Sequence, residues 1–299
     1  MQFRILGPPE LYDETRDRSL PIGAPRPRRL LGTLLTRPDS PVAGETLVRE
    51  LWGVTPPRGA LHSLGVQVAA LRRALRRLEP GTTPGSSRLV ARGAGYALRV
   101  RPAETDFGVF GQTLARARRT AALDPEGTYA SLRRGLALWR GPVLGGGALG
   151  PRCAGLAAGL ERERRLALEI YFDCALRTGR HERVVPELRD AVAADPLRER
   201  LHDQLMLALC RCGRGPEAIG VYRRARARLV DAAGGTPLLT ARLEQISVCS
   251  PVLADPAAEP GPAAASLPGP VPGETVADPP PLSVTGYLAE LLSGRVLSS

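Results

Sequence analysis

The spacing of apolar residues divides the chain into a short region of strands, three helices, two further strands and a long series of helices. Alternating and short apolar runs predict a small antiparallel sheet of three segments, at residues 3–6, 10–12 and 19–22. Apolar residues that recur every three or four positions predict three helices, at residues 26–37, 45–52 and 58–78. Two strand-like runs around Gly93-Ala94-Gly95 then predict a β-hairpin, with strands at residues 88–92 and 96–100.

The helix predicted at residues 58–78 has two very different faces. Thr55 can cap its start, and Pro56 can occupy its first position, where a missing N–H costs nothing. Its opposite face is small and uncharged at first and rich in arginine later, which suits a DNA major groove with its bases and phosphates. A basic face that is merely solvated is the alternative interpretation. One apolar stripe runs along the helix and must be buried: Leu61, Leu64, Val68, Leu71, Leu75 and Leu78.

Beyond Arg101 the pattern is helical throughout. It predicts seven helices, at residues 107–122, 127–139, 156–178, 181–194, 198–211, 216–230 and 238–248. The segment that begins at Gly213 follows the similar segment at Gly179 by 34 residues, which is the period of tetratricopeptide repeats. Helix pairs at this period stack into a solenoid, an architecture that binds proteins and does not suggest catalysis.

Charge is distributed unevenly along the chain. Residues 1–101 contain 17 Arg and 8 acidic residues, so this third is the best candidate for binding an anionic partner. All 41 basic residues are arginine, a bias typical of GC-rich genomes. Residues 251–299 are net acidic and rich in Pro, Ala and Gly, which predicts a disordered tail.

Several kinds of chemistry are excluded or unsupported. Without lysine, the chain has neither the lysine of a phosphate-binding P-loop nor that of a Schiff-base enzyme. Cys210 and Cys212 lie in a helical pattern without partners at metal-ligand spacing, which favours small core residues. No catalytic triad or carboxylate pair is recognisable. The sequence therefore predicts no enzyme, no cofactor and no metal. The N-terminus lacks the pattern of a signal peptide and no apolar run could span a membrane, which predicts a cytoplasmic protein. DNA binding by the basic first third would make it nucleoid-associated.

Particular motifs resemble a known family. The order of sheet, three helices and hairpin is typical of a winged helix-turn-helix. Residues 89–98, LVARGAGYAL, resemble the wing of OmpR/PhoB-type domains, and residues 71–75, LRRAL, resemble the end of their recognition helix. Glu50-Leu51-Trp52-Gly53 followed by Pro56-Pro57 resembles the shorter form in the Streptomyces antibiotic regulatory protein family. Three later segments resemble the bacterial transcriptional activator domain of that family: residues 137–144, 195–209 and 218–230.

This resemblance implies a fold and a domain organisation. It predicts an α+β winged helix-turn-helix N-terminal domain at residues 1–101, followed by an all-α tetratricopeptide-like helical-repeat domain at residues 102–250. The tail at residues 251–299 is the third part.

The resemblance also implies the residues that contact DNA. The third helix enters the major groove, so four of its side chains approach base edges: His62, Ser63, Val66 and Gln67. Three arginines hold phosphates: Arg58, Arg72 and Arg73. Arg92 reaches the adjacent minor groove from the wing, and Arg26 adds a backbone contact. Ala69, Ala70 and Ala91 depart from the family pattern, which commonly has polar or basic residues in these places.

The function implied is a sequence-specific DNA-binding activator of a secondary-metabolite (antibiotic) gene cluster. Such an activator binds direct repeats in double-stranded promoter DNA as a side-by-side homodimer and recruits the RNA polymerase holoenzyme. The alternative is a helical-repeat adaptor whose winged domain binds protein rather than DNA, and Ala69 and Ala70 favour it.

Overall fold

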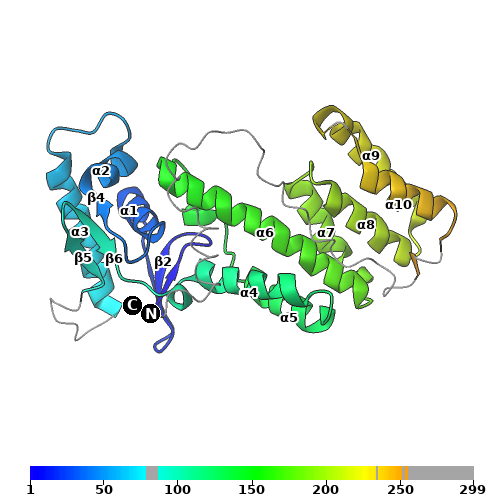
Figure 1. The fold of residues 1–299 in the computed structure, drawn as a ribbon, viewed down its shortest axis with the longest axis horizontal. Helices are drawn as coiled ribbons and strands as arrows, with labels where there is room; N and C mark the ends of the chain where they lie inside the picture. The colour runs from blue at the N-terminus through cyan, green and yellow to red at the C-terminus, as the bar shows by residue number, and fades with distance from the viewer. Residues whose placement is uncertain (79–86, 234, 251–252, 255–299) are drawn as a thin grey trace, which may run out of the picture. The chain divides into compact units, whose positions relative to one another are not determined.

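A computed structural model describes residues 1–78, 87–233, 235–250 and 253–254. The described residues form two compact units (Figure 1). The first unit contains residues 1–78, 87–114 and 135–164, and the second contains residues 115–134 together with those from 165 onward. Nearly all of the tail predicted at residues 251–299 lies outside the described residues.

The first unit begins with a small sheet, as the sequence predicts. Strands β1 (Gln2–Arg4), β2 (Glu10–Asp13) and β3 (Arg18–Pro21) pair antiparallel in the order β1-β2-β3. The buried carboxylate of Asp106 accepts hydrogen bonds from the backbone N–H groups of Ile5 and Leu6, just after β1. These hydrogen bonds tie the sheet to the first turn of helix α4 (Asp106–Thr120).

Three helices and a second sheet complete the winged helix-turn-helix, and the predicted fold class is confirmed. The helices are α1 (Pro25–Leu35), α2 (Gly44–Trp52) and α3 (Ala60–Leu78). The hairpin of β5 (Leu89–Arg92) and β6 (Gly95–Leu98) forms the wing. Figure 1 shows these helices and strands gathered together. The sequence did not predict β4 (Val42–Ala43), which pairs with β6 and makes the sheet three-stranded, in the order β4-β6-β5.

The start of α3 corrects two predictions. The helix begins at Ala60 and not at Arg58, so Thr55 and Pro56 lie before it and do not cap it. A turn with a positive φ of 77° at Gly59 separates them from the helix. The apolar stripe is also shorter than predicted, because Leu61 is 64% exposed whereas Leu64 is 2% exposed. The other stripe residues are buried as expected: Val68, Leu71, Leu75 and Leu78.

The described residues from 102 to 250 are mainly helical, which confirms the predicted succession of helices. A short 3-10 turn, η2 (Pro102–Glu104), precedes it, and another, η3 (Val143–Gly145), interrupts it. The helices are α4 (Asp106–Thr120), α5 (Pro125–Leu136), α6 (Pro151–Arg177), α7 (His181–Ala194), α8 (Glu199–Arg211), α9 (Gly215–Ala233) and α10 (Pro237–Ser247). Three bounds differ from the prediction by three residues or more: α5 ends three residues earlier than residue 139, α6 begins five residues earlier than residue 156, and α9 ends three residues later than residue 230.

The predicted 34-residue period has a matching geometry in the second unit. Gly179 and Gly213 end α6 and α8 with φ values of 73° and 72°, in the left-handed region that favours glycine. The N–H of the next residue closes each end, from Arg180 to the carbonyl of Ala175 at 2.9 Å and from Arg214 to that of Leu209 at 2.8 Å. Packing between α7 and α8 and between α8 and α9 is the stacking of a helical repeat.

A buried ionic network links three helices of the second unit. Asp173 of α6 accepts hydrogen bonds from Arg200 and Gln204 of α8. Asp203, also on α8, pairs with Arg242 of α10 at 2.8 Å and with Arg200 at 3.5 Å.

The described helices include none that combines the length and the apolar composition of a membrane span.

Candidate nucleic-acid interface

Helix α3 presents an outward face opposite its buried leucines. The solvent-exposed residues recur at helical spacing: Leu61, His62, Val66, Ala69, Arg73, Arg76 and Arg77. The first half of this face carries no charge, and the second half ends in arginines. This confirms the two-faced pattern that the sequence predicts for the helix, while its contact with DNA stays a prediction.

The side chains predicted to approach base edges lie along this face and its border. His62 and Val66 are exposed, and Val66 is exposed over 52% of its surface. Ser63 and Gln67 are half-buried at the border of the face. Ala69 is exposed as well, so the middle of the face offers only methyl groups. A surface of this kind can contact thymine methyl groups and has few hydrogen-bonding groups for base readout.

The two neighbouring arginines of α3 differ in what they contact. Arg73 is exposed, and none of the ion pairs among the described residues includes it. Arg72 is half-buried, and its Nε donates a hydrogen bond to the carbonyl of Leu89 on β5 at 3.0 Å. Its guanidinium also lies 5.9 Å from the ring centre of Tyr96 on β6. Arg72 therefore fastens α3 to the wing, a role that the sequence did not indicate.

Arg92 ends β5 next to the tip of the wing. It is exposed, and its Nη1 lies 3.5 Å from the carbonyl of Asp39, a long hydrogen bond. The turn of Gly93 and Ala94 follows directly, and Gly93 has a φ of 54°. An exposed guanidinium at a tight glycine turn can enter a narrow minor groove with little steric hindrance.

The two remaining predicted contacts lie on separate elements of the first unit. Arg26 is in the first turn of α1, exposed, with its guanidinium 5.5 Å from the ring centre of Trp52. Arg58 is exposed in the turn before α3. Trp52 and Tyr96 are both half-buried, and the guanidinium group of an arginine lies over each ring.

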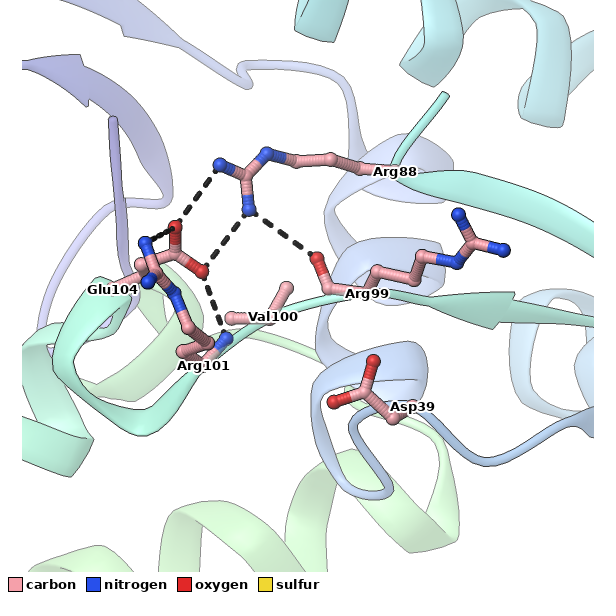
Figure 2. Close-up of a pocket in the computed structure, with 6 residues that line it drawn as sticks. All are labelled: Asp39, Arg88, Arg99, Val100, Arg101 and Glu104. Atoms are coloured by element: carbon pink, nitrogen blue, oxygen red, sulfur yellow. Dashed lines mark hydrogen bonds and ion pairs between the residues drawn. The ribbon is translucent and has the colours of Figure 1, made fainter. Parts of the chain in front are cut away.

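A pocket of about 330 Å³ lies at the base of the wing (Figure 2). Glu104 is held there between Arg88, at 3.0 Å, and Arg101, at 3.1 Å. Burial raises the pKa of Glu104, but the hydrogen bonds from the two arginines outweigh burial and lower the pKa to about 2. Arg99 extends away from this cluster in Figure 2. The two arginines thus balance the negative charge of Glu104, and these ion pairs join the wing to η2.

Sequence reasoning missed two exposed apolar side chains beside the predicted contacts. Val54, in the loop between α2 and α3, is 93% exposed, and Leu61 is the stripe residue that remains in solvent. The loop position of Val54 between Gly53 and Pro56 could have indicated its exposure. Among the described residues, no group of three His, Cys, Asp or Glu side chains is arranged to hold a metal ion.

Comparisons with known proteins identify relatives of this chain. Residues 105–245 match the model of the bacterial transcriptional activator domain. The chain is 36% identical to the transcriptional regulator RedD of Streptomyces coelicolor, over 86% of this chain and 73% of RedD. It is 34% identical to the regulatory protein DnrI of Streptomyces peucetius, over 82% of this chain and 90% of DnrI.

A solved structure is similar as well. Mycobacterium tuberculosis EmbR, in complex with a low-affinity phosphopeptide, matches with a TM-score of 0.74 and 30% identity. The match covers 86% of this chain and 66% of the EmbR chain, so this chain spans about two thirds of that EmbR chain. The relatives are named as regulators and not as enzymes, in agreement with the prediction from the sequence.

Proposed function

The chain belongs to the Streptomyces antibiotic regulatory protein family of transcriptional regulators, and from this premise we propose that it is a sequence-specific DNA-binding activator. Its targets are the promoters of a secondary-metabolite, or antibiotic, biosynthetic gene cluster. It acts in the cytoplasm on the chromosome.

One observation carries the DNA-binding proposal. The outward face of α3 carries no charge in its first half and exposes Arg73, Arg76 and Arg77 toward its end. A helix in the major groove needs small side chains near the bases and guanidinium groups near the phosphates. The exposed Arg92 beside the wing turn supplies a second contact, in the neighbouring minor groove.

The same function includes two protein partners. A second copy of the chain binds a neighbouring direct repeat, so that two recognition helices lie about one helical turn apart on one side of the duplex. The helical repeats supply the contacts between the two protomers and recruit the RNA polymerase holoenzyme. Stacked helix pairs are an architecture that commonly binds proteins, which supports this assignment.

Selection from a random duplex library, followed by gel-shift titration, tests the proposal. We expect enrichment of two short direct repeats about one turn apart, and binding that weakens steeply with salt. Addition of RNA polymerase should then produce a ternary complex and transcription from a promoter with these repeats. Failure to enrich any duplex at low ionic strength would contradict DNA binding.

The exposed apolar side chains of Val54 and Leu61 favour a second candidate, an adaptor whose winged domain binds protein. A Val54→Ser variant distinguishes the two functions, because Val54 lies in the loop before α3 and outside the outward face of that helix. Under the proposed function it binds the selected duplex as well as the wild-type protein does. An adaptor would lose its protein partner, and its wild-type form would enrich no duplex.

A further inference from the structure

The buried carboxylate of Glu50 lies against the first turn of a helix that begins far along the chain. Glu50 is on α2, the helix that packs with α3, and it is only 3% exposed. Its Oε1 accepts a hydrogen bond from the backbone N–H of Arg152 at 2.9 Å. Its Oε2 accepts one from the N–H of Cys153 at 3.4 Å. Both donors belong to the first turn of α6, so Glu50 caps α6 from another helix.

The sequence of α6 explains why it needs this outside cap. Its first turn contains no acidic residue, and Gly150, which precedes Pro151, has no side chain that could accept a hydrogen bond. The N-terminus of a helix carries partial positive charge and unpaired N–H groups, which a carboxylate satisfies well. None of the ion pairs among the described residues includes Glu50, so the start of α6 is its electrostatic partner.

Two glycines allow the close approach that this cap requires. A Cβ atom at Gly150 would lie 2.8 Å from both Cδ and the carbonyl oxygen of Glu50. A Cβ atom at Gly32 of α1 would lie 2.7 Å from Cδ1 of Leu144 and 3.0 Å from the sulfur of Cys153. That sulfur is fully buried and lies 3.4 Å from the hydroxyl of Thr33. The start of α6 is therefore seated against both α1 and α2.

We infer that Glu50 is a positioning residue, which fixes the start of α6 on the helix that supports α3. The inference rests on the proposed DNA-binding function. Helix α6 is continuous over 27 residues, and its last residues, from 165 onward, belong to the second unit. The cap thereby connects α3, which binds one DNA repeat, to the helical domain that contacts the neighbouring protomer. Each protomer can then bind a single repeat without the cap, but the two protomers need it to bind cooperatively.

Four forms of the full chain test this inference: wild type, Glu50→Gln, Gly150→Ala and Gly155→Ala. Gly155 is the matched control, because it is also at the start of α6 and a Cβ atom there would meet no other atom within 4 Å. Each protein is titrated against a selected duplex with one repeat, with two repeats in phase, and with the repeats moved apart by half a turn, about five base pairs. Thermal unfolding checks that each form is folded. Hydrogen exchange of the Arg152 and Cys153 amides reports on the cap without DNA.

We expect Glu50→Gln and Gly150→Ala to bind one repeat within about twofold of wild type, and to lose about tenfold of the extra affinity for two repeats in phase. Both should also lose sensitivity to the half-turn shift and exchange the two amides faster, while Gly155→Ala behaves as wild type. An equal loss on one and two repeats would overturn the inference, since Glu50 would then only stabilise the DNA-binding fold. Unchanged cooperativity in both variants would overturn it as well. If wild type binds no duplex, the proposed function fails, and unchanged amide exchange in both variants would then separately refute the cap.

Discussion

Single residues with the same side chain can have different roles, as Arg72 and Arg73 show. Arg73 is exposed, whereas Arg72 donates to the carbonyl of Leu89. We expect Arg73→Ala to weaken binding to all duplexes about equally and to reduce the slope of log affinity against log salt by about one, because one phosphate contact is lost. The free energy of unfolding should stay within about 0.5 kcal/mol of wild type.

Arg72→Ala serves as the comparison. Loss of its hydrogen bond and of its stacking on Tyr96 should lower the free energy of unfolding by about 1 kcal/mol, measured by urea titration. An equal loss of stability in both variants would show that Arg73 is a structural residue too.

The buried side chain of Glu163 makes the free energy of unfolding depend on pH. Burial raises the pKa of Glu163 on α6 to about 7, and Arg162 offsets this only in part. Because the folded state holds the proton more tightly than the unfolded state does, stability falls as pH rises from about 4.5 to about 7 and stays low above that. Glu163→Gln, which remains neutral, should therefore be more stable than wild type at pH 8, by on the order of 2 kcal/mol. Near pH 4 the two proteins should unfold at the same urea concentration. A constant difference from pH 4 to pH 8 would contradict the raised pKa.

At the scale of elements, α3 shows how far an apolar pattern determines burial. Leu61 and Leu64 both fall on the predicted stripe, yet Leu61 is 64% exposed and Leu64 is 2% exposed. We expect Leu64→Ala to lower the free energy of unfolding by about 2 to 5 kcal/mol, since it leaves a cavity. Leu61→Ala should change it by less than about 0.5 kcal/mol. Chemical denaturation of the two variants measures this contrast, and a large loss in Leu61→Ala would place that side chain in the core.

The ionic network of α6, α8 and α10 gives another element-scale prediction. Asp203 is 3% exposed and pairs with Arg242, which is buried, and with Arg200, which is half-buried, so Asp203→Ala removes the carboxylate beside the buried Arg242. We expect a loss of about 3 to 5 kcal/mol in the free energy of unfolding. The matched variant is Arg189→Ala, which breaks a surface pair with Glu217 and should cost less than about 1 kcal/mol. Similar losses in both would mean that the network contributes no more than a surface pair.

The sequence predicts an element well when residues next to it in the chain mark where it begins and ends. The sequence predicts α7 to the residue, because Gly179 ends the preceding helix and a regular apolar pattern follows. It predicts α6 five residues short, because the cap of α6 comes from Glu50, 102 residues before Arg152. The two-residue strand β4 is too short to show an alternation.

The same limit applies to the candidate interface. Periodicity predicted the face of α3 that carries Arg73, and the structure leaves that side chain in solvent. It could not predict that the Nε of Arg72 donates to the carbonyl of Leu89, because that contact depends on how the wing folds back on the helix. Exposure on a helix follows from spacing, whereas a partner on another element does not.

At the scale of the whole molecule, the boundary predicted at residue 101 can be tested by cutting the chain there. The first compact unit also includes residues 102–114 and 135–164. Backbone N–H groups pair with the carbonyls of Leu6 and Ile5, from Arg140 at 2.7 Å and from Leu144 at 2.9 Å. A fragment of residues 1–101 loses these bonds, the carboxylate of Asp106 and the cover over Gly32.

We therefore expect the fragment of residues 1–101 to lack a cooperative unfolding transition, and a fragment of residues 1–164 to keep one and to bind a single repeat. Exposure of the buried apolar surface that the later residues cover should cost several kcal/mol, a large share of the stability of a small domain. Circular dichroism during urea titration of both fragments and the full chain measures the difference. A shorter fragment that unfolds cooperatively and binds DNA as tightly as the longer one would establish residue 101 as the boundary. The residues that follow would then serve the helical repeats alone.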